Sequence, residues 1–476
     1  MHAARTSAAG LLLALAACTA APPPDDDAPT TAPSTSPSAT PATEVPLAML
    51  AHRGRTGRDV TAAQARAVLA DGATDWSALG YDAAPMRVVT GDTGGTVGDA
   101  VEDVGSAAAA VELAATRDDT LAVVPATAAE PRVDALRVDG VDPLRSPERY
   151  AITTPADAAA EPVVTVTITG DTMLGRRVGE EIERRADPAY PLRPFADRLA
   201  AADVAFTNLE STLSQAGAAQ QGGDSFGAAP SVRQGLTAAG IDVVGLANNH
   251  LGDYGATAIE RTLARLDAFA TVGGGRDLDE ARRPAVVEHD GVRIGFVATD
   301  SIGETPAATA TRPGTNRIDA PPRTGPLDRA QLDRVAADVR ALDAEVDAVV
   351  VVPHWGTQYT HRPEQSQRQM ARAFADAGAD LVVGGHPHWV QGWETIGAVP
   401  VVHSLGNFVF DMDFSRQTQE GIVLEAVFWG GRLVALDPVP YVIGDDLAPR
   451  PVTGERAASI LRDVRSESRA PYDRLR

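Results

Sequence analysis

The sequence predicts an α/β fold, with a large layered domain in the C-terminal two-thirds of the chain and a smaller α/β domain before it. Short runs of β-branched and aliphatic residues recur along the chain and are separated by segments with helical periodicity. Such alternation is typical of sheets covered by helices. With 476 residues, of which 44% are hydrophobic, the chain is long enough for two or three domains with a sizeable core.

The first 17 residues (1–17) are predicted to be a lipoprotein signal peptide. Their apolar run is too short to span a membrane as a helix. It ends in Leu15-Ala16-Ala17-Cys18, which resembles the bacterial lipobox, whose cysteine is acylated. The alternative is an ordinary secretory signal with a chance cysteine. We expect an exported protein anchored to the outer face of the cell membrane through lipidated Cys18.

Residues 18–45 are predicted to be a disordered tether. They are mostly Ala, Pro, Thr, Ser and Asp. This composition buries too little apolar surface to offset the conformational entropy of the chain. The segment is therefore expected to extend and to lift the folded part off the membrane.

Residues 46–160 are predicted to form the small α/β domain. Its expected elements are helices at 62–70 and 101–115 and strands at 86–90 and 120–125. The stretch 121–143 weakly resembles part of the periplasmic solute-binding proteins, which leaves a nutrient-receptor function open. No cluster of catalytic residue types occurs in this domain, and the isolated His52 is expected to be a surface or hydrogen-bonded histidine.

Residues 161–450 are predicted to form the main domain, followed by a terminal helix or tail at 451–476. Helical periodicity occurs at 326–342 and 365–377, and Gly430-Gly431 is expected at the turn of a hairpin spanning 421–442. The expected strands are 163–169, 204–208, 243–247, 293–299, 348–353, 381–384 and 401–404.

The charge of the chain excludes two classes of partner. The formal net charge is −22 and the isoelectric point is near 4.8. Nucleic-acid binding needs a basic footprint, so no nucleic-acid partner is expected. Electrostatic docking on anionic lipid is disfavoured for the same reason. The single cysteine excludes an internal disulfide.

Polar residues cluster just after the predicted strands of the main domain. Ligands of open α/β sheets bind beyond the carboxyl ends of the strands, so these clusters predict one site. Five of the nine histidines lie in them. The clusters are Gly170-Asp171-Thr172-Met173-Leu174-Gly175-Arg176, Asn208-Leu209-Glu210-Ser211, Ala247-Asn248-Asn249-His250, Pro353-His354-Trp355-Gly356, Gly384-Gly385-His386-Pro387-His388 and His403-Ser404-Leu405-Gly406-Asn407-Phe408.

The residue types in these clusters favour a divalent metal. Mixed ligation by carboxylate, amide and imidazole groups suits Mn, Fe or Zn better than Cu(I) or an iron–sulfur cluster, which prefer thiolates. Any one of these histidines could instead be a buried, hydrogen-bonded side chain. Taken together, the clusters predict a metal centre with one or two ions.

The same motifs, in this order and together with Asp253-Tyr254-Gly255, resemble those of the CapA family, which includes poly-γ-glutamate capsule proteins. The resemblance covers about residues 162–440. It implies the calcineurin-like metallophosphoesterase fold, a two-layer β-sandwich flanked by helices.

The resemblance also implies roles for individual residues. His250 is implied as the general acid beside the substrate. Glu210 falls where the superfamily places a carboxylate that bridges two metals. The full set of implied metal ligands is Asp171, Glu210, Asn249, His354, His386 and His388.

Two positions depart from the pattern of the enzyme superfamily. Met173 stands where a histidine ligand is usual, and a thioether is a poor ligand for hard divalent ions. Glu210 replaces the usual Asp and is one methylene longer. One tight metal with a weak or absent second is therefore expected alongside the two-metal alternative.

The expected function is that of a cell-surface lipoprotein of the CapA type, linked to the synthesis or export of capsule, poly-γ-glutamate or another envelope polymer. Its site is expected to be a metal-dependent phosphoesterase-type hydrolase acting on a phosphoester or anionic polymer, with capsule-synthesis proteins as further partners. Arg176 is expected to clamp a phosphoryl or carboxylate oxygen, with a surface ion pair as the alternative. The competing function is a non-catalytic, metal-dependent scaffold that binds or exports a polyanion.

Overall fold

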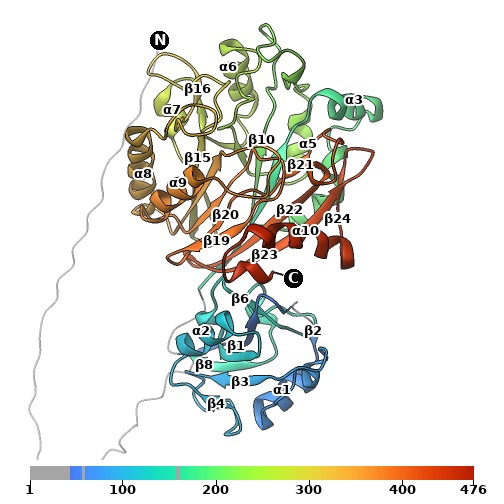
Figure 1. Ribbon diagram of the computed structural model, residues 1–476, viewed down its shortest axis with the longest axis vertical. Coiled ribbons are helices and arrows are strands. Elements are labelled where there is room, and N and C mark those ends of the chain that lie inside the picture. Colours follow the sequence, from blue (N-terminus) through green and yellow to red (C-terminus); the bar gives the residue numbers. More distant parts are fainter. Residues whose placement is uncertain (1–42, 56–58, 157–160, 476) are drawn as a thin grey trace, which may run out of the picture. The chain divides into compact units, whose positions relative to one another are not determined.

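The computed structural model in Figure 1 describes residues 43–55, 59–156 and 161–475. The predicted signal peptide, Cys18 and tether residues 18–42 lie outside the described residues. Residues 43–45, predicted to end the tether, instead begin strand β1 (Thr43–His52), because they pair with residues 154–156 and Val45 is buried. Each helix of the described ranges falls short of the length or apolar character that a membrane crossing requires.

The N-terminal lobe, residues 43–156, contains a six-stranded sheet with the order β4-β3-β5-β1-β6, in which β8 also pairs with β1. Besides β1, its strands are β3 (Arg87–Thr90), β4 (Glu102–Asp103), β5 (Thr120–Pro125), β6 (Val133–Ala135) and β8 (Thr153–Ala156). A separate parallel pair joins β2 (Asp59–Val60) to β7 (Arg137–Val138). The helices are α1 (Ala62–Asp71) and α2 (Ala107–Thr116), with short 3₁₀ turns η1 (Trp76–Leu79), η2 (Ala126–Ala128) and η3 (Pro147–Arg149).

Side-chain caps decide where the two helices of this lobe begin. Thr61 and Gln64 form a reciprocal capping box at the start of α1. The prediction that the second helix starts at residue 101 is wrong, because Ser106 caps the helix by accepting a hydrogen bond from the Ala109 N–H. Residues 102–103 form β4 instead.

The main domain begins with an eight-stranded sheet, called here the first sheet, with the order β12-β11-β10-β9-β22-β23-β24 and with β21 paired to β9. Strands β9, β10, β11 and β12 run parallel, so their carboxyl ends share one edge. The strands are β9 (Val163–Thr172), β10 (Val204–Leu209), β11 (Val243–Gly245), β12 (Ala270–Val272), β21 (Asn407–Val409), β22 (Glu420–Trp429), β23 (Arg432–Ile443) and β24 (Pro449–Pro451). The hairpin predicted at 421–442 is confirmed as β22 and β23.

A six-stranded sheet, called here the second sheet, has the order β14-β15-β17-β18-β20-β19. Its strands β15, β17, β18 and β20 are also parallel. The strands are β14 (Ala285–His289), β15 (Val292–Asp300), β17 (Ala348–His354), β18 (Leu381–Val383), β19 (Trp393–Ile396) and β20 (Val399–Val402), and a small ladder joins β13 (Gly274–Gly275) to β16 (Gly314–Thr315). The strand predicted at 401–404 is wrong at its end, since β20 stops at Val402.

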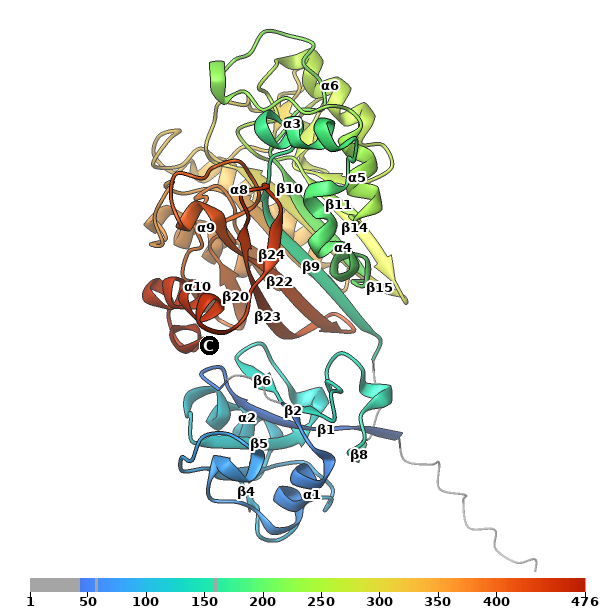
Figure 2. The ribbon, with the colours of Figure 1, turned by 90° about the vertical axis from the view of Figure 1, so that its right-hand side faces the viewer.

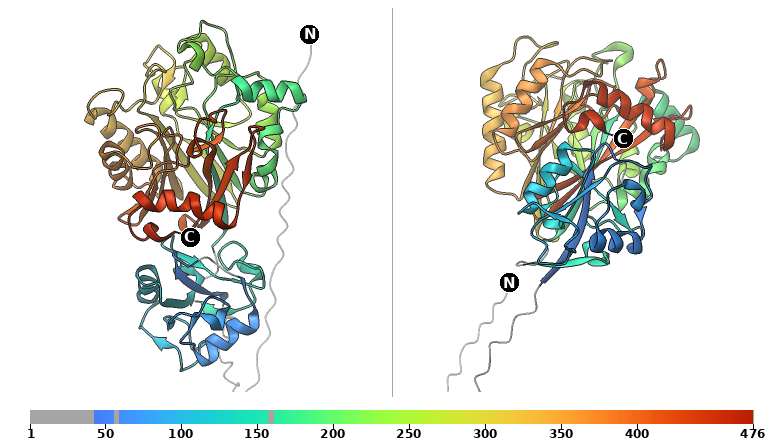
Figure 3. Two further views of the ribbon diagram at one scale, coloured as in Figure 1. Left: turned by 45° about the vertical axis from the view of Figure 1, so that its right-hand side comes forward. Right: turned by 60° about the horizontal axis from the view of Figure 1, so that its bottom comes forward.

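Helices cover the outer faces of both sheets, as Figures 2 and 3 show. Buried side chains of α3 (Arg176–Arg185), α4 (Arg193–Ala200), α5 (Val232–Ala238) and α6 (Ala256–Arg265) join a core cluster with the first sheet. Those of α8 (Arg329–Asp343) and α9 (Gln365–Ala375) join a cluster with the second sheet. The remaining elements are α7 (Leu278–Arg282), α10 (Gly454–Glu467), η4 (Tyr190–Leu192), η5 (Gly222–Asp224), η6 (Gln417–Gln419) and η7 (Tyr472–Arg474).

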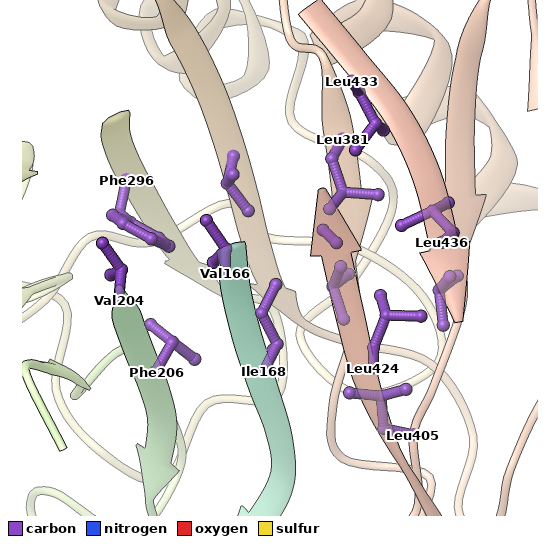
Figure 4. Packing of buried hydrophobic residues seen from close by; sticks show 14 of the residues in the cluster. Val166, Ile168, Val204, Phe206, Phe296, Leu381, Leu405, Leu424, Leu433 and Leu436 are labelled. Atoms are coloured by element: carbon purple, nitrogen blue, oxygen red, sulfur yellow. The ribbon is translucent and has the colours of Figure 1, made fainter. Parts of the chain in front are cut away.

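The inner faces of the two sheets share one hydrophobic core (Figure 4). Phe206 of the first sheet stacks on Phe296 of the second, with 5.6 Å between the ring centroids and 11° between the planes. Ile460 and Val464 of α10 are buried in the same core, so the terminal segment, expected to be a helix or a tail, forms a packed helix. Each buried aliphatic or aromatic side chain contributes about 1.5–3 kcal/mol.

An aspartate precedes four of the parallel strands and fixes each one to its neighbour. In every case a carboxylate oxygen accepts a hydrogen bond from a backbone N–H of the adjacent strand. The pairs are Asp203 with Thr165, Asp242 with Ala205, Asp347 with Arg293 and Asp380 with Val349, at 2.7–2.8 Å. These bonds set the register at the amino ends, and so determine which residues meet at the carboxyl ends.

Candidate metal centre

Asp171 lies at the end of β9 with no exposed surface. Its Oδ1 accepts a hydrogen bond from Asn208 Nδ2 and its Oδ2 accepts one from the His386 backbone N–H, both at 2.9 Å. A Cβ on Gly385 would lie 2.5 Å from Asp171 Oδ1, so glycine is needed for this close approach. The carboxylate is therefore held between the ends of both sheets.

Glu210 follows β10 and is also fully buried. Its Oε1 lies 3.3 Å from Asn208 Nδ2 and 3.4 Å from His354 Nε2, while its Oε2 has no hydrogen-bond partner. Burial raises the pKa of Glu210 well above its ordinary value, and the nearby charge of Asp171 raises it further.

Three buried histidines complete the cluster at the end of the second sheet. The ring centroids of His354 and His386 are 5.0 Å apart, and those of His386 and His388 are 5.7 Å apart. Burial lowers the pKa of His354 to about 3 and lowers that of His386 well below its usual range. Both imidazoles are therefore neutral near pH 7, which is the form that binds metals.

Second-layer amides orient these imidazoles. His388 Nδ1 lies 2.8 Å from Asn407 Oδ1, so Nδ1–H donates and the lone pair of Nε2, which Gln358 Nε2 approaches to 3.4 Å, would be the ligand. Asn208 Nδ2 lies 3.2 Å from His354 Nδ1. His386 and His388 have positive φ angles of 95° and 58°, a conformation that is costly for such residues and is typically retained at functional sites.

The donor set fits a divalent cation. Asp171, Glu210 and His354 each offer a ligand atom, and the three atoms lie within 4.8 Å of one another. In the described part of the chain no arginine pairs with either carboxylate, and both ring nitrogens of buried His386 lack partners. A cavity of about 20 Å³ is lined by Asp171, His354 and Gly385 among others, which is the scale of one small ion or water. Leaving such groups unpaired costs several kcal/mol, which a cation would offset.

Asn249 and His250 lie beside this cluster. Asn249 Oδ1 is 3.0 Å from His354 Nε2, close enough for the amide to join the ligand set. His250 Nδ1 lies 2.9 Å from Asp253 Oδ2, so Nδ1–H donates to Asp253. The His250 ring stacks on Phe226 at 3.8 Å. The imidazole is thus fixed, and its Nε2 lies 2.9 Å from Asn249 Nδ2.

Arg176, the predicted substrate clamp, is ion-paired in the structure. Its guanidinium forms an ion pair with Asp411 and a longer one with Asp224, at 3.4 Å. It also lies 4.7 Å over the ring of Phe226, which in turn stacks on His250. The ion-pair alternative is therefore present in the structure, and the clamp stays a prediction.

Met173 belongs to the hydrophobic core cluster of the first sheet. Its side chain is fully buried in the core cluster under α3, and its sulfur lies 3.1 Å from the Gly175 N–H. The position that usually supplies a second-metal histidine thus carries a buried thioether, and the weak or absent second ion stays a prediction.

Sequence reasoning missed several residues of the site. Asn208 and Asn407 stand inside the strand-end motifs, where an amide next to a predicted ligand could have signalled their orienting role. Asp253 follows His250 by three residues, a spacing that signals a possible pair. Glu304, whose Oε2 accepts a hydrogen bond from Asn249 Nδ2 at 2.9 Å, lies in a loop with no motif.

Comparison with known proteins agrees with the motif pattern. The family described as "Bacterial capsule synthesis protein PGA_cap" matches residues 165–412. The capsule biosynthesis protein CapA of Bacillus anthracis is 31% identical over 300 residues, covering 61% of this chain and 70% of that protein. The PGA biosynthesis protein CapA of Bacillus subtilis (strain 168) is 35% identical over 185 residues, covering 38% of this chain and 46% of that protein.

Among solved structures, a hypothetical protein from Thermus thermophilus aligns with a TM-score of 0.37 and 19% identity, over 59% of this chain and 99% of that one. This likeness is too low to add to the argument. The family match spans the strands that carry Asp171, Glu210, His354 and His386. The chain belongs to the bacterial capsule synthesis protein family PGA_cap, the family of CapA.

Proposed function

We propose that this chain is a cell-surface lipoprotein whose metal-dependent, phosphoesterase-like site acts during the synthesis or export of capsule, poly-γ-glutamate or another envelope polymer. The observation that carries the proposal is the buried cluster of Asp171, Glu210 and His354, with unpartnered ligand atoms, beside the His250–Asp253 pair. The printed names of the two CapA relatives support the link to capsule and polymer synthesis. Lipidation of Cys18 is proposed from the lipobox alone.

We also infer the finer architecture, a two-layer β-sandwich of the metallophosphoesterase type over residues 161–450, preceded by a small α/β domain at 46–160 that shares a core cluster with β22 and β23. In support, the two sheets of the main domain share one core, and helices cover their outer faces. The sheet of the N-terminal lobe has its own strand order, separate from both.

Asp171, Glu210, His354 and His386 would hold the ion, with Asn249 and His388 as further ligands. Their mixed oxygen and nitrogen donors suit Mn, Fe or Zn. When bound, such an ion supplies Lewis-acid chemistry, since it polarises phosphoryl oxygens and lowers the pKa of water.

His250 would act as the general acid. Asp253 accepts its Nδ1–H and also accepts hydrogen bonds from the Phe226 N–H at 2.6 Å and from Gln221 Nε2 at 2.5 Å, so the carboxylate itself is fixed. Nε2, which lies 2.9 Å from Asn249 Nδ2 in the structure, would be the atom that gives a proton to the leaving alkoxide oxygen. General acid catalysis of this kind contributes about 10²–10⁴-fold in rate.

The test is the His250→Ala variant of the full-length protein. We expect its turnover of bis(p-nitrophenyl) phosphate to fall by about 10²-fold or more, with metal content measured by elemental analysis nearly unchanged. Equal loss of metal would make His250 a ligand instead. Glu210→Gln is the matched control, since it should lower the metal content directly.

The second candidate function is a non-catalytic, metal-dependent scaffold that binds a polyanion. The thioether of Met173 in place of a histidine ligand favours it, because a single ion without a second is a weaker hydrolytic centre. Absence of turnover by the wild type with Mn, Fe and Zn, together with metal-dependent binding of poly-γ-glutamate, would support the scaffold and refute hydrolysis.

A further inference from the structure

Two exposed aromatic rings stand beside the candidate metal centre. Phe414 is 65% exposed and Tyr359 is 38% exposed; in the described ranges, the only other exposed large hydrophobic residue is Val286. The ring centroids of Tyr359 and Phe414 lie 5.4 Å apart, and the ring planes are nearly perpendicular, at 83°. We call this pair the aromatic corner. Exposed aromatic pairs of this kind are typical of ligand sites.

The aromatic corner adjoins the predicted ligands directly. The Tyr359 ring stacks on His388 with 5.9 Å between centroids and 28° between planes. The Tyr359 backbone N–H also donates to the Pro387 carbonyl at 2.9 Å. A group that is bound at the metal centre and continues outward on this side would therefore meet these two rings.

Tyr359 is held in place by a strained backbone. Its φ angle is 61°, in the left-handed region where a bulky residue costs about 1–2 kcal/mol. Strain of this kind persists when the surrounding structure enforces it, and it is concentrated at functional sites. The position of the ring is thus specified, which a chance surface tyrosine would not require.

The charged residues around the aromatic corner indicate what kind of ligand it binds. Asp413, next to Phe414, is paired with Arg177, and its side chain is 55% exposed. Asp224 is 81% exposed and is paired at 3.4 Å with Arg176. Each carboxylate keeps acceptor positions for hydroxyl groups, and because an arginine offsets its charge, the two pairs do not form a basic patch of the kind that binds a polyanion.

We propose that the aromatic corner binds the sugar ring of a phosphate-linked glycan, so that the substrate of the site is a sugar-phosphate ester. The aliphatic face of the sugar packs on an aromatic ring, its hydroxyls meet the paired carboxylates of Asp224 and Asp413, and its phosphate enters the metal centre. The phosphate part rests on the proposed function, whereas binding of the ring needs no hydrolysis.

The experiment measures binding of glucose 1-phosphate and of glycerol 1-phosphate to the full-length protein with Mn²⁺ by calorimetry. Both probes carry the same phosphate, but only the first has a ring. Phe414→Leu and Tyr359→Leu each remove one of the two aromatic rings. Tyr359→Phe keeps the ring, and Val286→Ala removes an equally exposed apolar side chain elsewhere, so these two are the controls.

We expect the wild type to prefer glucose 1-phosphate about tenfold or more. Each Leu variant should lose about three- to tenfold of that preference, since an aromatic contact of about 0.5–1.5 kcal/mol corresponds to this range. Affinity for glycerol 1-phosphate and the thermal midpoint should stay unchanged. The two control variants should behave like the wild type.

Equal binding of both phosphates by the wild type, or an unchanged preference in both Leu variants, overturns the inference. Tighter binding of poly-γ-glutamate than of glucose 1-phosphate, lost in the Leu variants, also overturns it. If the preference depends on the aromatic corner but no ester is hydrolysed, the sugar site stands and the hydrolase function fails. If both esters are bound and hydrolysed equally, the hydrolase function stands and the sugar site fails.

Discussion

Glu210→Gln should leave the metal-free protein nearly as stable as the wild type and yet abolish its stabilisation by metal. Glu210 is fully buried beside Asp171, and its Oε2 has no partner. A buried carboxylate without a counter-ion is expensive, so without a cation this side chain contributes little or negative stability. With a cation, it becomes a strong attractive partner. Glutamine has the same shape and no charge.

The magnitude follows from ligand linkage. A metal present at 100 times its Kd stabilises the native state by about 2.7 kcal/mol. If loss of this anionic donor raises Kd about 100-fold, the same concentration gives only about 0.4 kcal/mol. Without metal, the exchange of one unpaired polar atom for another should change the free energy of unfolding by less than about 1 kcal/mol.

Urea denaturation of both proteins, with chelator and with Mn²⁺, measures these differences. Glu394→Gln is the matched control, since Glu394 is equally buried but pairs with Arg368 at 2.6 Å and with Arg469 at 2.8 Å. It should destabilise the protein to the same extent with and without metal. A loss of about 3 kcal/mol in metal-free Glu210→Gln, or a full metal response in that variant, would refute the reasoning.

Three further predictions concern pH, positioning and anchoring. Burial raises the pKa of Asp380 from 3.8 to about 6, so the folded state disfavours ionisation of this carboxyl group. The free energy of unfolding should therefore fall, by at most about 3 kcal/mol, as pH rises from about 4 to about 6. Asp380→Asn keeps an oxygen for the Val349 N–H and should flatten that slope in urea titrations across pH; an unchanged slope would contradict the assignment. Asp253→Asn should lower kcat by about 10²-fold or more with little change in KM or metal content, because a neutral amide stabilises the protonated imidazole of His250 less than a carboxylate does; a change in KM alone would argue against positioning. Cys18→Ser should move the protein from the membrane fraction to the soluble fraction, and its retention in membranes on fractionation would exclude lipid anchoring.

Most residues of the candidate site could be predicted from the strand-end motifs, because local sequence determines where each strand ends. A β-branched run followed by a polar residue fixes both the strand and the position of Asp171 or His354 at its end, and parallel pairing brings those ends to one edge. The Asn407 contact with His388 could be anticipated in the same way, since both residues lie in motifs.

Long-range pairings could not be anticipated from sequence. Arg176 stands 235 positions from Asp411, and nothing near either residue indicates that they meet. Glu304 reaches Asn249 only because the loop after β15 folds over the end of the first sheet. Met173 shows the same limit: its side chain enters the core, a direction that depends on the packing of α3 rather than on its neighbours in sequence.

The local geometry of β9 explains how Asp171, a residue of the first sheet, reaches the metal centre at the end of the second sheet. Val166 and Ile168 point into the shared core, and strict alternation would send Gly170 the same way and Asp171 to the opposite face. The register shifts there, since Phe206 pairs with Ile168 while Asn208 pairs with Asp171, so β9 carries one extra residue. A bulge of one residue reverses the facing of the side chain that follows, which turns Asp171 toward the His386 N–H. Gly170 makes the bulge possible, because a Cβ there would overlap the Gly406 carbonyl. The metal centre therefore depends on a backbone irregularity as much as on its ligands.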